Sequence, residues 1–252
     1  MSQEFDDLEP NDLLVLISGM SGGGKSASLM NLRNPEKWMY LNCESGKRLP
    51  FKSKFQQYKI TDPYQVYDAF DYATENPDDF DGIIIDTATF LMEMFESQYV
   101  LTADNTMQAW GDYQQFFKNL MQQKVPIFNK PVIILAHVKD EIDDNGVKTT
   151  SVPVKGALKN NGIEAYFSTV VTVQKETMKV LKEYKNDYLH IEEEEESLGF
   201  KHVFQTKVTN KSTGTRIRSP LKLFSKDETF IDNDAQQLLD ILAEYYDIPI
   251  KK

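Results

Sequence analysis

The feature that most constrains this chain is a run of eight residues near its N-terminus, Gly19 to Ser26 (GMSGGGKS), which matches the pattern G-x-x-x-x-G-K-[ST] in full. Glycines let such a loop curl until successive backbone N–H groups point at one anion. The run lies between an apolar segment, Leu13–Ser18, and a helical pattern that begins at Lys25 and extends to about Leu32. A buried strand followed by a helix is the context that this motif requires, so the sequence predicts a site for a nucleoside triphosphate.

We expect ATP and Mg²⁺ as the cofactors of this site. In a loop of this kind the lysine bridges the β- and γ-phosphates, and the final hydroxyl ligates Mg²⁺. The residues expected to contact the nucleotide are Gly19, Ser21, Gly22, Gly23, Gly24, Lys25, Ser26 and Ala27. A second motif belongs with the loop, because the apolar strand Gly82–Ile85 ends at Asp86, as a Walker B strand does. The expected metal ligands are Ser26 and Asp86, the latter either directly or through water.

The rest of the first half alternates between strand and helix patterns. Further strands are expected at Trp38–Cys43 and Pro131–Ala136, with helices from Asp62 to about Glu75 and near Ala88–Tyr99 and Thr106–Lys124. This order predicts an α/β fold, with a mostly parallel sheet covered by helices.

The second half has a different character. A polar stretch at Asp140–Thr150 is expected to be a loop, and Gly156–Ala165 a short helix. Strand-like segments separated by the loop Asn186–Gly199 predict antiparallel additions at the sheet edge; they are Phe167–Val173, Lys179–Tyr184, His202–Thr209 and Arg216–Phe224. Asp232 or Asn233 is expected to cap a final amphipathic helix. The predicted organisation is a short arm at residues 1–12, a core at 13–225 and a C-terminal helix packed on that core at 226–252.

Composition narrows the function. The net charge of −11 argues against a general polyanion-binding surface, and the single cysteine, Cys43, excludes an intramolecular disulfide. No apolar run approaches the roughly 20 residues that a membrane span needs, and the N-terminus is unlike a signal peptide. We therefore expect a protein of the cytoplasm with no membrane partner.

Hydrolysis requires a group that orients or deprotonates water. Glu44 directly follows the second predicted strand, at the sheet edge from which the glycine-rich loop emerges. His137 ends the Pro131–Ala136 strand at the same edge, where it could sense the γ-phosphate. An exposed glutamate and a histidine bonded to backbone are the structural alternatives for these two positions.

The order of these parts resembles the RecA-like ATPases. In that family a P-loop precedes a strand that ends in the catalytic glutamate, then come Walker B, a strand that ends in a polar sensor and a mobile DNA-binding loop. These features fall here on GMSGGGKS, Glu44, Asp86 and His137. The resemblance covers about residues 13 to 225 and implies a RecA-like P-loop core with ATP hydrolysis, stimulated by DNA. It also implies lysines that reach a neighbouring subunit's nucleotide, with Lys211 as the first candidate for a catalytic role in trans.

Within that group, the compact length and the segments WGDYQQFF (110–117) and KPVIILAH (130–137) look most like short RecA-like proteins of bacteriophages, the Sak-type single-strand annealing proteins. The sequence departs from the family at its sensor position, which is His137 where bacterial RecA has glutamine. The stretch before Leu13 is very short for the arm exchange by which such proteins form filaments.

Charge is segregated along the chain. Residues 201–226 carry five lysines, two arginines and no acidic residue, a formal +7, so the remainder sums to −18. These cations could contact phosphates of a single strand, act on a neighbouring subunit's nucleotide, or pack against the protein's own acidic surface. The candidate DNA-binding residues are Lys139, Lys155, Lys159, Lys207, Arg216 and Arg218.

The sequence thus favours an ATP-dependent recombinase or annealing protein that binds single-stranded DNA and assembles head to tail with copies of itself. A nucleotide-switched assembly or loading factor that binds protein is the alternative, favoured by the acidic total and by the acidic residues after Lys139. A small-molecule kinase fits less well, because no arginine-rich lid stands out.

Overall fold

A computed structural model of the chain describes residues 9–142, 144 and 146–249. The predicted arm at residues 1–12, in which Phe5 is a candidate anchor, lies largely outside the described residues. The described residues form an eight-stranded sheet in the order β10-β9-β8-β1-β5-β4-β2-β3 and a separate hairpin of β6 and β7. The strands are β1 Leu14–Gly19, β2 Trp38–Asn42, β3 Gln56–Lys59, β4 Gly82–Asp86, β5 Val132–His137, β6 Lys139–Ile142, β7 Lys148–Ser151, β8 Thr169–Thr177, β9 Phe200–Gln205 and β10 Phe230–Asp232.

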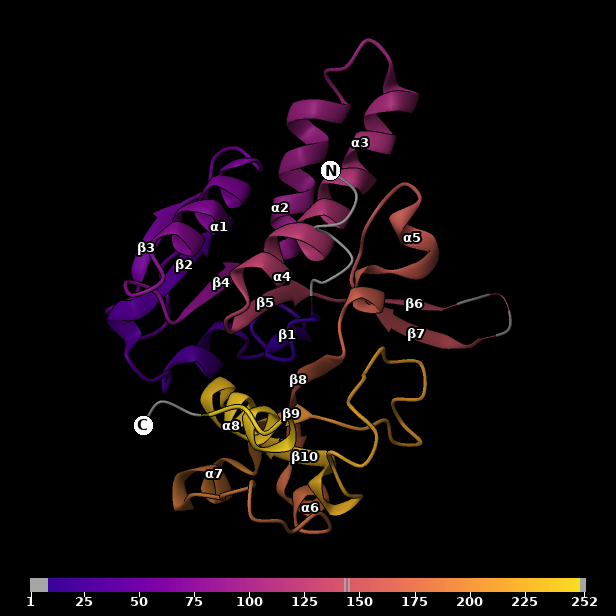
Figure 1. The fold of residues 1–252 in the computed structure, drawn as a ribbon. Helices are drawn as coiled ribbons and strands as arrows, with labels where there is room; N and C mark the ends of the chain where they lie inside the picture. The colour runs from indigo at the N-terminus through magenta and orange to yellow at the C-terminus, as the bar shows by residue number, and fades with distance from the viewer. Residues whose placement is uncertain (1–8, 143, 145, 250–252) are drawn as a thin grey trace.

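The six strands from β8 to β3 in that order run parallel to one another, and β9 pairs antiparallel with both β8 and β10. This confirms the predicted α/β class, a mostly parallel RecA-like sheet with antiparallel additions on its C-terminal side. The α-helices are α1 Gln65–Glu75, α2 Ala88–Phe95, α3 Thr106–Asn119, α4 Val125–Phe128, α5 Leu158–Asn161, α6 Met178–Leu181, α7 Glu193–Leu198 and α8 Ala235–Tyr245. Figure 1 shows α2 and α3 extending as a pair beyond the sheet, and the β6–β7 hairpin projecting on another side.

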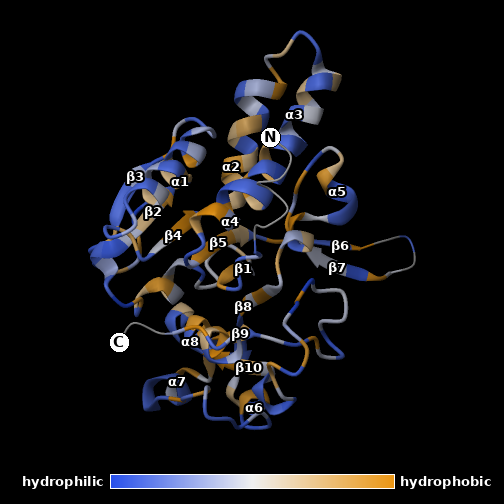
Figure 2. Ribbon diagram, viewed as in Figure 1, coloured by the Kyte–Doolittle hydropathy of each residue, from blue (hydrophilic) through white to orange (hydrophobic). Residues whose placement is uncertain are grey.

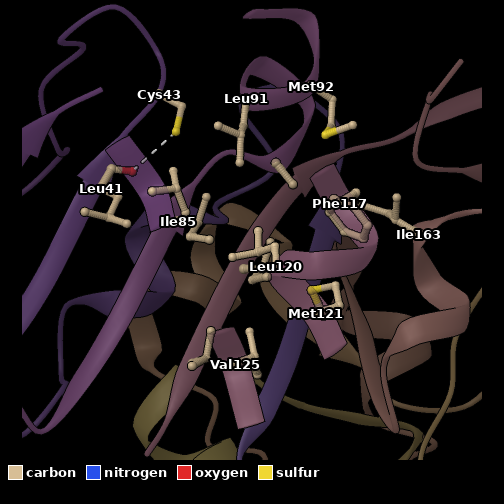
Figure 3. Close-up of a cluster of buried hydrophobic side chains, with 14 of the residues drawn as sticks. Leu41, Cys43, Ile85, Leu91, Met92, Phe117, Leu120, Met121, Val125 and Ile163 are labelled. Atoms are coloured by element: carbon tan, nitrogen blue, oxygen red, sulfur yellow. Dashed lines mark hydrogen bonds between the residues drawn. The ribbon is translucent and has the colours of Figure 1, made fainter. Parts of the chain in front are cut away.

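Each central strand is buried on both faces, which explains its continuous apolar sequence. Alternate residues of β1 enter opposite cores, with Leu14 and Leu16 on the side of α1–α4 and Val15 and Ile17 on the side of α8. Figure 2 shows the hydrophobic colours gathered on central strands such as β4 and β5, whereas α7 is hydrophilic. The first core is seen in Figure 3, where Leu91 and Met92 of α2 lie above Leu120 and Met121. This double burial fixes the sheet rigidly beneath its carboxyl edge.

Several predicted elements in the second half are wrong. Where the polar stretch 140–150 was expected to be a loop, residues 139–142 and 148–151 pair as the β6–β7 hairpin, with Lys139 opposite Ser151. Residues 179–184 begin in helix α6, because β8 continues to Thr177 before the chain turns. The Arg216–Phe224 segment is irregular apart from a bridge between Arg218 and Val170, since Pro220 lacks the N–H that a ladder requires. Most of the predicted loop's acidic run at 192–196 is helix α7.

The C-terminal segment contributes more than a helix. β10 joins the sheet, and α8 packs its apolar face against the second core. The side chain of Asp234, rather than Asp232 or Asn233, caps α8 by accepting the N–H groups of Gln236 and Gln237. Among the described residues, no helix combines the length and the apolar character needed to cross a membrane.

Candidate nucleotide site

The glycine-rich loop joins β1 to a short turn of 3₁₀ helix, η1 (Ser26–Leu29). Gly22 and Gly24 have φ values of +72° and +108°, in the region that glycine adopts most easily. A Cβ on Gly24 would lie 2.9 Å from Asn233 Nδ2. The loop therefore requires glycine at these positions for backbone conformation and, at Gly24, for space as well.

The helix predicted from Lys25 to Leu32 is wrong in its length and type. The Ser28 N–H is shared between the carbonyls of Gly24 at 3.1 Å and Lys25 at 3.2 Å, and the Ser28 hydroxyl also donates to the Lys25 carbonyl at 2.6 Å, so this turn tightens to the 3₁₀ type. The Gly24 carbonyl accepts from Asn233 Nδ2 at 3.0 Å. With only four residues of 3₁₀ helix present, anion binding depends on the loop's own N–H groups and on Lys25 rather than on a long helix dipole.

Two residues that sequence reasoning missed hold the outside of the loop. His202 of β9 contacts the Gly23 carbonyl oxygen through Nδ1 at 2.6 Å, where the ring nitrogen must be the donor. Asn233, just before α8, bonds the next carbonyl, that of Gly24. Both contacts turn carbonyl oxygens outward, which leaves the N–H side of the loop for an anion.

Lys25 is almost fully buried, with 5% of its surface exposed. Its ammonium donates to the carbonyl oxygens of Gly19 at 2.9 Å and Met20 at 3.0 Å, and to His137 Nδ1 at 3.2 Å. Burial lowers the pKa of Lys25 to about 8, although the charges of Asp86 and Glu44 oppose that shift. The ammonium is thus held inward by weak backbone acceptors, and a phosphate would be a better partner.

Asp86 ends β4 beside the loop. Its Oδ2 accepts hydrogen bonds from the Ser26 hydroxyl at 2.9 Å and from the Tyr40 hydroxyl at 2.6 Å. Its Oδ1 is buried without a hydrogen-bond partner. Burial raises the pKa of this carboxyl, against the two hydrogen bonds. Tyr40, on β2, is a further residue that the sequence analysis did not single out.

These donors fit a magnesium ion. A buried carboxylate oxygen without a partner, next to a serine hydroxyl, is a cost unless a cation or donor satisfies it. No cluster of three or more histidine, cysteine or acidic side chains suited to a metal is found among the described residues. Mg²⁺ is usually held by one or two protein ligands together with phosphates. Ser26 and Asp86 are the residues that would hold it.

Glu44 and His137 meet, as their positions at the sheet edge predict. Glu44 Oε1 lies 2.9 Å from His137 Nε2, and its Oε2 accepts from Lys47 at 2.9 Å. Burial acts to raise the pKa of Glu44, but the hydrogen bonds from Lys47 and His137 outweigh it and lower the pKa. Thr89 accepts the backbone N–H of His137 at 2.9 Å, so α2 also positions the end of β5. Glu44 is therefore an ionised carboxylate near the loop.

The glycine-rich loop, Glu44, Asp86 and His137 meet at one cavity of about 380 Å³. Of the predicted site residues, the cavity brings together the segment Gly22–Ala27, Glu44, Asp86 and His137. Gly19 and Ser21 lie in the loop but are not among the described residues that line the cavity, and Lys211 is not among them either. The lining is completed by Tyr40, Lys47, Arg48, Pro50, His202 and Asn233.

A second cavity, of about 680 Å³, lies between α2, the β6–β7 hairpin and residues 151–162. We call it the hairpin groove. Four of the six predicted DNA-binding residues line it, namely Lys139, Lys155, Lys159 and Arg216. The other two are bound to carbonyls of the chain itself, Lys207 to Phe224 at 3.0 Å and Arg218 to Ala165 and Phe167 at 3.5 and 3.4 Å.

The cations of the hairpin groove are not all free. Lys155 pairs with Glu96 at 2.7 Å and Arg216 with Glu164 at 3.2 Å, while Lys139 lies 3.6 Å from Glu141. Glu93 lines the groove as well. Its surface is thus mixed in charge, rather than uniformly basic.

The sheet order and the nucleotide cavity together define an α/β fold with a P-loop at the carboxyl edge of a mostly parallel sheet. The sequence matches the AAA domain family over residues 11–214, and the chain belongs to that family. A solved structure of a KaiC-like protein from the hyperthermophilic archaeon Pyrococcus horikoshii OT3 is similar to it, with 13% identity and a TM-score of 0.44. That similarity covers 83% of this chain and 87% of the other. No curated protein matches the sequence.

Proposed function

We propose that this protein is an ATP- and Mg²⁺-dependent single-stranded-DNA-binding protein of recombination, related to the Sak-type annealing proteins of bacteriophages that its sequence resembles. The observation that carries the proposal is the hairpin groove. Four cations that the sequence predicts to bind DNA line this groove together. The groove lies directly beyond β5, the strand that ends at the nucleotide cavity. A single strand would lie with its phosphates toward Lys139, Lys155 and Lys159.

The two sites share a physical link. His137 is the last residue of β5 and lines the nucleotide cavity, and Lys139, two residues on, begins the hairpin that walls the groove. A change in the contacts of His137 therefore acts on the hairpin through a single intervening residue. This is a short route by which nucleotide could control the groove.

The hydrolytic chemistry assigned to the site rests on the charges already described. Lys25 would neutralise charge on the phosphates, and Glu44, held ionised by Lys47 and His137, would orient or accept a proton from the attacking water. Bound Mg²⁺ would supply further neutralisation of the phosphate oxygens. Lys25 comes from the loop, Glu44 and Lys47 from the segment after β2, and His137 from the end of β5.

We propose head-to-tail self-assembly as the active form, in which Lys211 completes the nucleotide site of a neighbouring copy. Lys211 is exposed in the segment after β9 and does not reach the cavity of its own chain. Leu221, ten residues further along the same irregular segment, exposes 83% of its surface. Both positions suit a surface that a second copy covers.

Fluorescence anisotropy of a labelled oligothymidylate, with and without Mg²⁺ and ATP, tests the DNA proposal. We expect binding that requires nucleotide, and an ATPase rate that rises with DNA. The double variant Lys139→Glu/Lys159→Glu should weaken binding at least tenfold and flatten the salt dependence, since each lost phosphate contact removes about 0.7 from the logarithmic slope. Lys185→Glu, an equally exposed lysine beyond α6, is the matched control.

The acidic side chains in the same groove favour the second candidate, a nucleotide-switched loading factor whose partner is a protein. Glu93 and Glu141 would then receive basic side chains of that partner. If the oligonucleotide does not bind at low salt in any nucleotide state, while ATP still binds, the DNA proposal is wrong and this candidate replaces it.

A further inference from the structure

The hydrogen bonds around His137 define its protonation state. The Lys25 ammonium has three N–H groups, and three acceptors surround it, the two loop carbonyls and His137 Nδ1. An ammonium donates and cannot accept. His137 Nδ1 is therefore the acceptor in the 3.2 Å contact and carries no hydrogen.

The other ring nitrogen has the opposite role. Nε2 lies 2.9 Å from Glu44 Oε1, and an ionised carboxylate can only accept. Nε2 must then carry the hydrogen of this bond. With one hydrogen on Nε2 and none on Nδ1, the imidazole of His137 is neutral and is held as a single tautomer between a cation and an anion.

The groups that face His137 explain why it stays neutral. A second proton, on Nδ1, would point directly at the Lys25 ammonium. Glu44 is the carboxylate that contacts the ring within the described part of the chain, and Lys47 already shares it. On the side of α2, the ring packs against the Phe90 ring in a T-shaped arrangement, with 5.7 Å between the ring centroids. Arg48 and Asp86 are further charged side chains that line the same cavity.

We propose that nucleotide binding at this site is accompanied by the uptake of one proton from solvent at His137 Nδ1. The inference rests on the proposed nucleotide function, because it requires Lys25 to exchange His137 for phosphate. Once Lys25 has turned away, Nδ1 loses its donor and faces a cavity that has gained negative charge. A proton from the buffer then binds Nδ1, and the charged ring bridges Glu44 and that added charge.

Proton uptake makes His137 a positioning residue. In the free protein it holds Lys25 on one side and Glu44 on the other. In the nucleotide-bound protein its charged ring draws Glu44 toward the nucleotide side of the cavity.

Calorimetry measures the proton directly. Binding of a non-hydrolysable ATP analogue, at pH 7 with saturating Mg²⁺, is recorded in three buffers of different ionisation enthalpy. The slope of the observed enthalpy against that ionisation enthalpy is the number of protons taken up, and we expect a value close to one. His137→Gln should bring it close to zero. His190→Gln, at an exposed histidine paired with Asp232, should leave it unchanged.

A second readout uses the unmodified chain, which has only three histidines. The ¹³Cε1 and ring ¹⁵N signals of His137 should change from those of a neutral, Nε2-protonated ring to those of a charged ring when the analogue binds. Binding with a slope near zero, an unchanged slope in His137→Gln, or a ring that stays neutral would each overturn the inference and leave the nucleotide site intact. Absence of binding heat in every buffer would instead overturn the proposed nucleotide site, and this inference with it.

Discussion

The nucleotide cavity and the hairpin groove lie beside each other, yet they treat their charges differently. In the cavity, Lys25 donates partly to backbone carbonyls, and one oxygen of Asp86 has no partner at all. In the groove, Lys155 and Arg216 are each paired with a carboxylate of the same chain. The cavity thus holds charges whose best partners would come from a ligand, whereas two of the groove's cations are already held by close carboxylate partners and a third, Lys139, lies 3.6 Å from Glu141.

This difference between the two sites shows that a basic side chain in a groove is not by itself a phosphate ligand. Arg216 contacts Glu164, whose side chain is only 7% exposed and whose Oε1 accepts the N–H of Val152 at 2.8 Å. This arginine keeps a buried carboxylate neutralised and so holds the wall of the groove. Lys139 and Lys159 are better candidates for DNA, because they are more exposed and more loosely held.

The contrast between the cavity and the groove is tested most directly at Lys25. Lys25→Met should weaken ATP binding by at least 100-fold, since two charge-assisted hydrogen bonds to phosphate are worth roughly 3 kcal/mol or more. Titration calorimetry with Mg²⁺ and ATP measures the loss. Lys37→Met, at a half-buried lysine just before the start of β2 and outside the cavity lining, is the control and should bind as the parent does. An affinity within threefold of the parent in Lys25→Met would show that the buried cation does not serve phosphate.

The same variant reports on the cost of burying that cation. The folded-state pKa of Lys25, about 8, lies below its ordinary value of 10.5, so the unfolded chain binds more protons between these values. Stability contributed at this position therefore rises with pH from about 8 to 10.5, by up to roughly 3 kcal/mol. The difference in free energy of unfolding between the parent and Lys25→Met should therefore shift in favour of the parent, by a large part of that amount, from pH 7.5 to pH 10.5. Denaturant unfolding at the two pH values measures it. A constant difference between the two proteins would contradict the lowered pKa.

A second variant tests the contrast from the side of the groove. Arg216→Met should lower the free energy of unfolding by about 3 kcal/mol, because Glu164 is left buried without its partner. Adding Glu164→Gln should restore most of the loss, since the neutral amide needs no cation. Urea unfolding of the single and double variants measures both effects. A stable Arg216→Met protein that has lost only its affinity for DNA would make Arg216 a phosphate ligand after all.

Sequence predicted the parts of the site whose position depends on strand order. Glu44, Asp86 and His137 each follow or end a parallel strand, and parallel strands deliver their carboxyl ends to one edge of the sheet. Strand order alone therefore predicts that these three residues meet, without any knowledge of contacts between distant segments. The first half of the fold could be predicted for the same reason, because its strands are apolar on both faces and alternate with helices.

The rest could not be predicted, because it depends on contacts between distant segments. The 3₁₀ turn after the loop is set by Ser28 and by Asn233, which is 209 residues from its partner Gly24. The hairpin that begins at Lys139 has a polar sequence, which is more typical of a loop, although the Asn145–Gly146 pair is a typical hairpin signal. His202 lies in a segment whose basic composition indicates its lysines and arginines as the functional residues, rather than this histidine.

These distant contacts also provide the smallest and most specific test of the comparison. His202→Ala and Asn233→Ala each remove one hydrogen bond to a loop carbonyl, and each should weaken ATP binding by roughly threefold to tenfold, as expected for a bond worth about 1 kcal/mol. Neither side chain donates to the nucleotide's acceptors in this arrangement, so the turnover of bound ATP should change less than affinity does. His190→Ala, which removes a histidine of the same half of the chain that does not touch the loop, is the matched control. Unchanged affinity in both variants would mean that the glycine-rich loop holds its own shape, and that the C-terminal strands and helix merely lie against it.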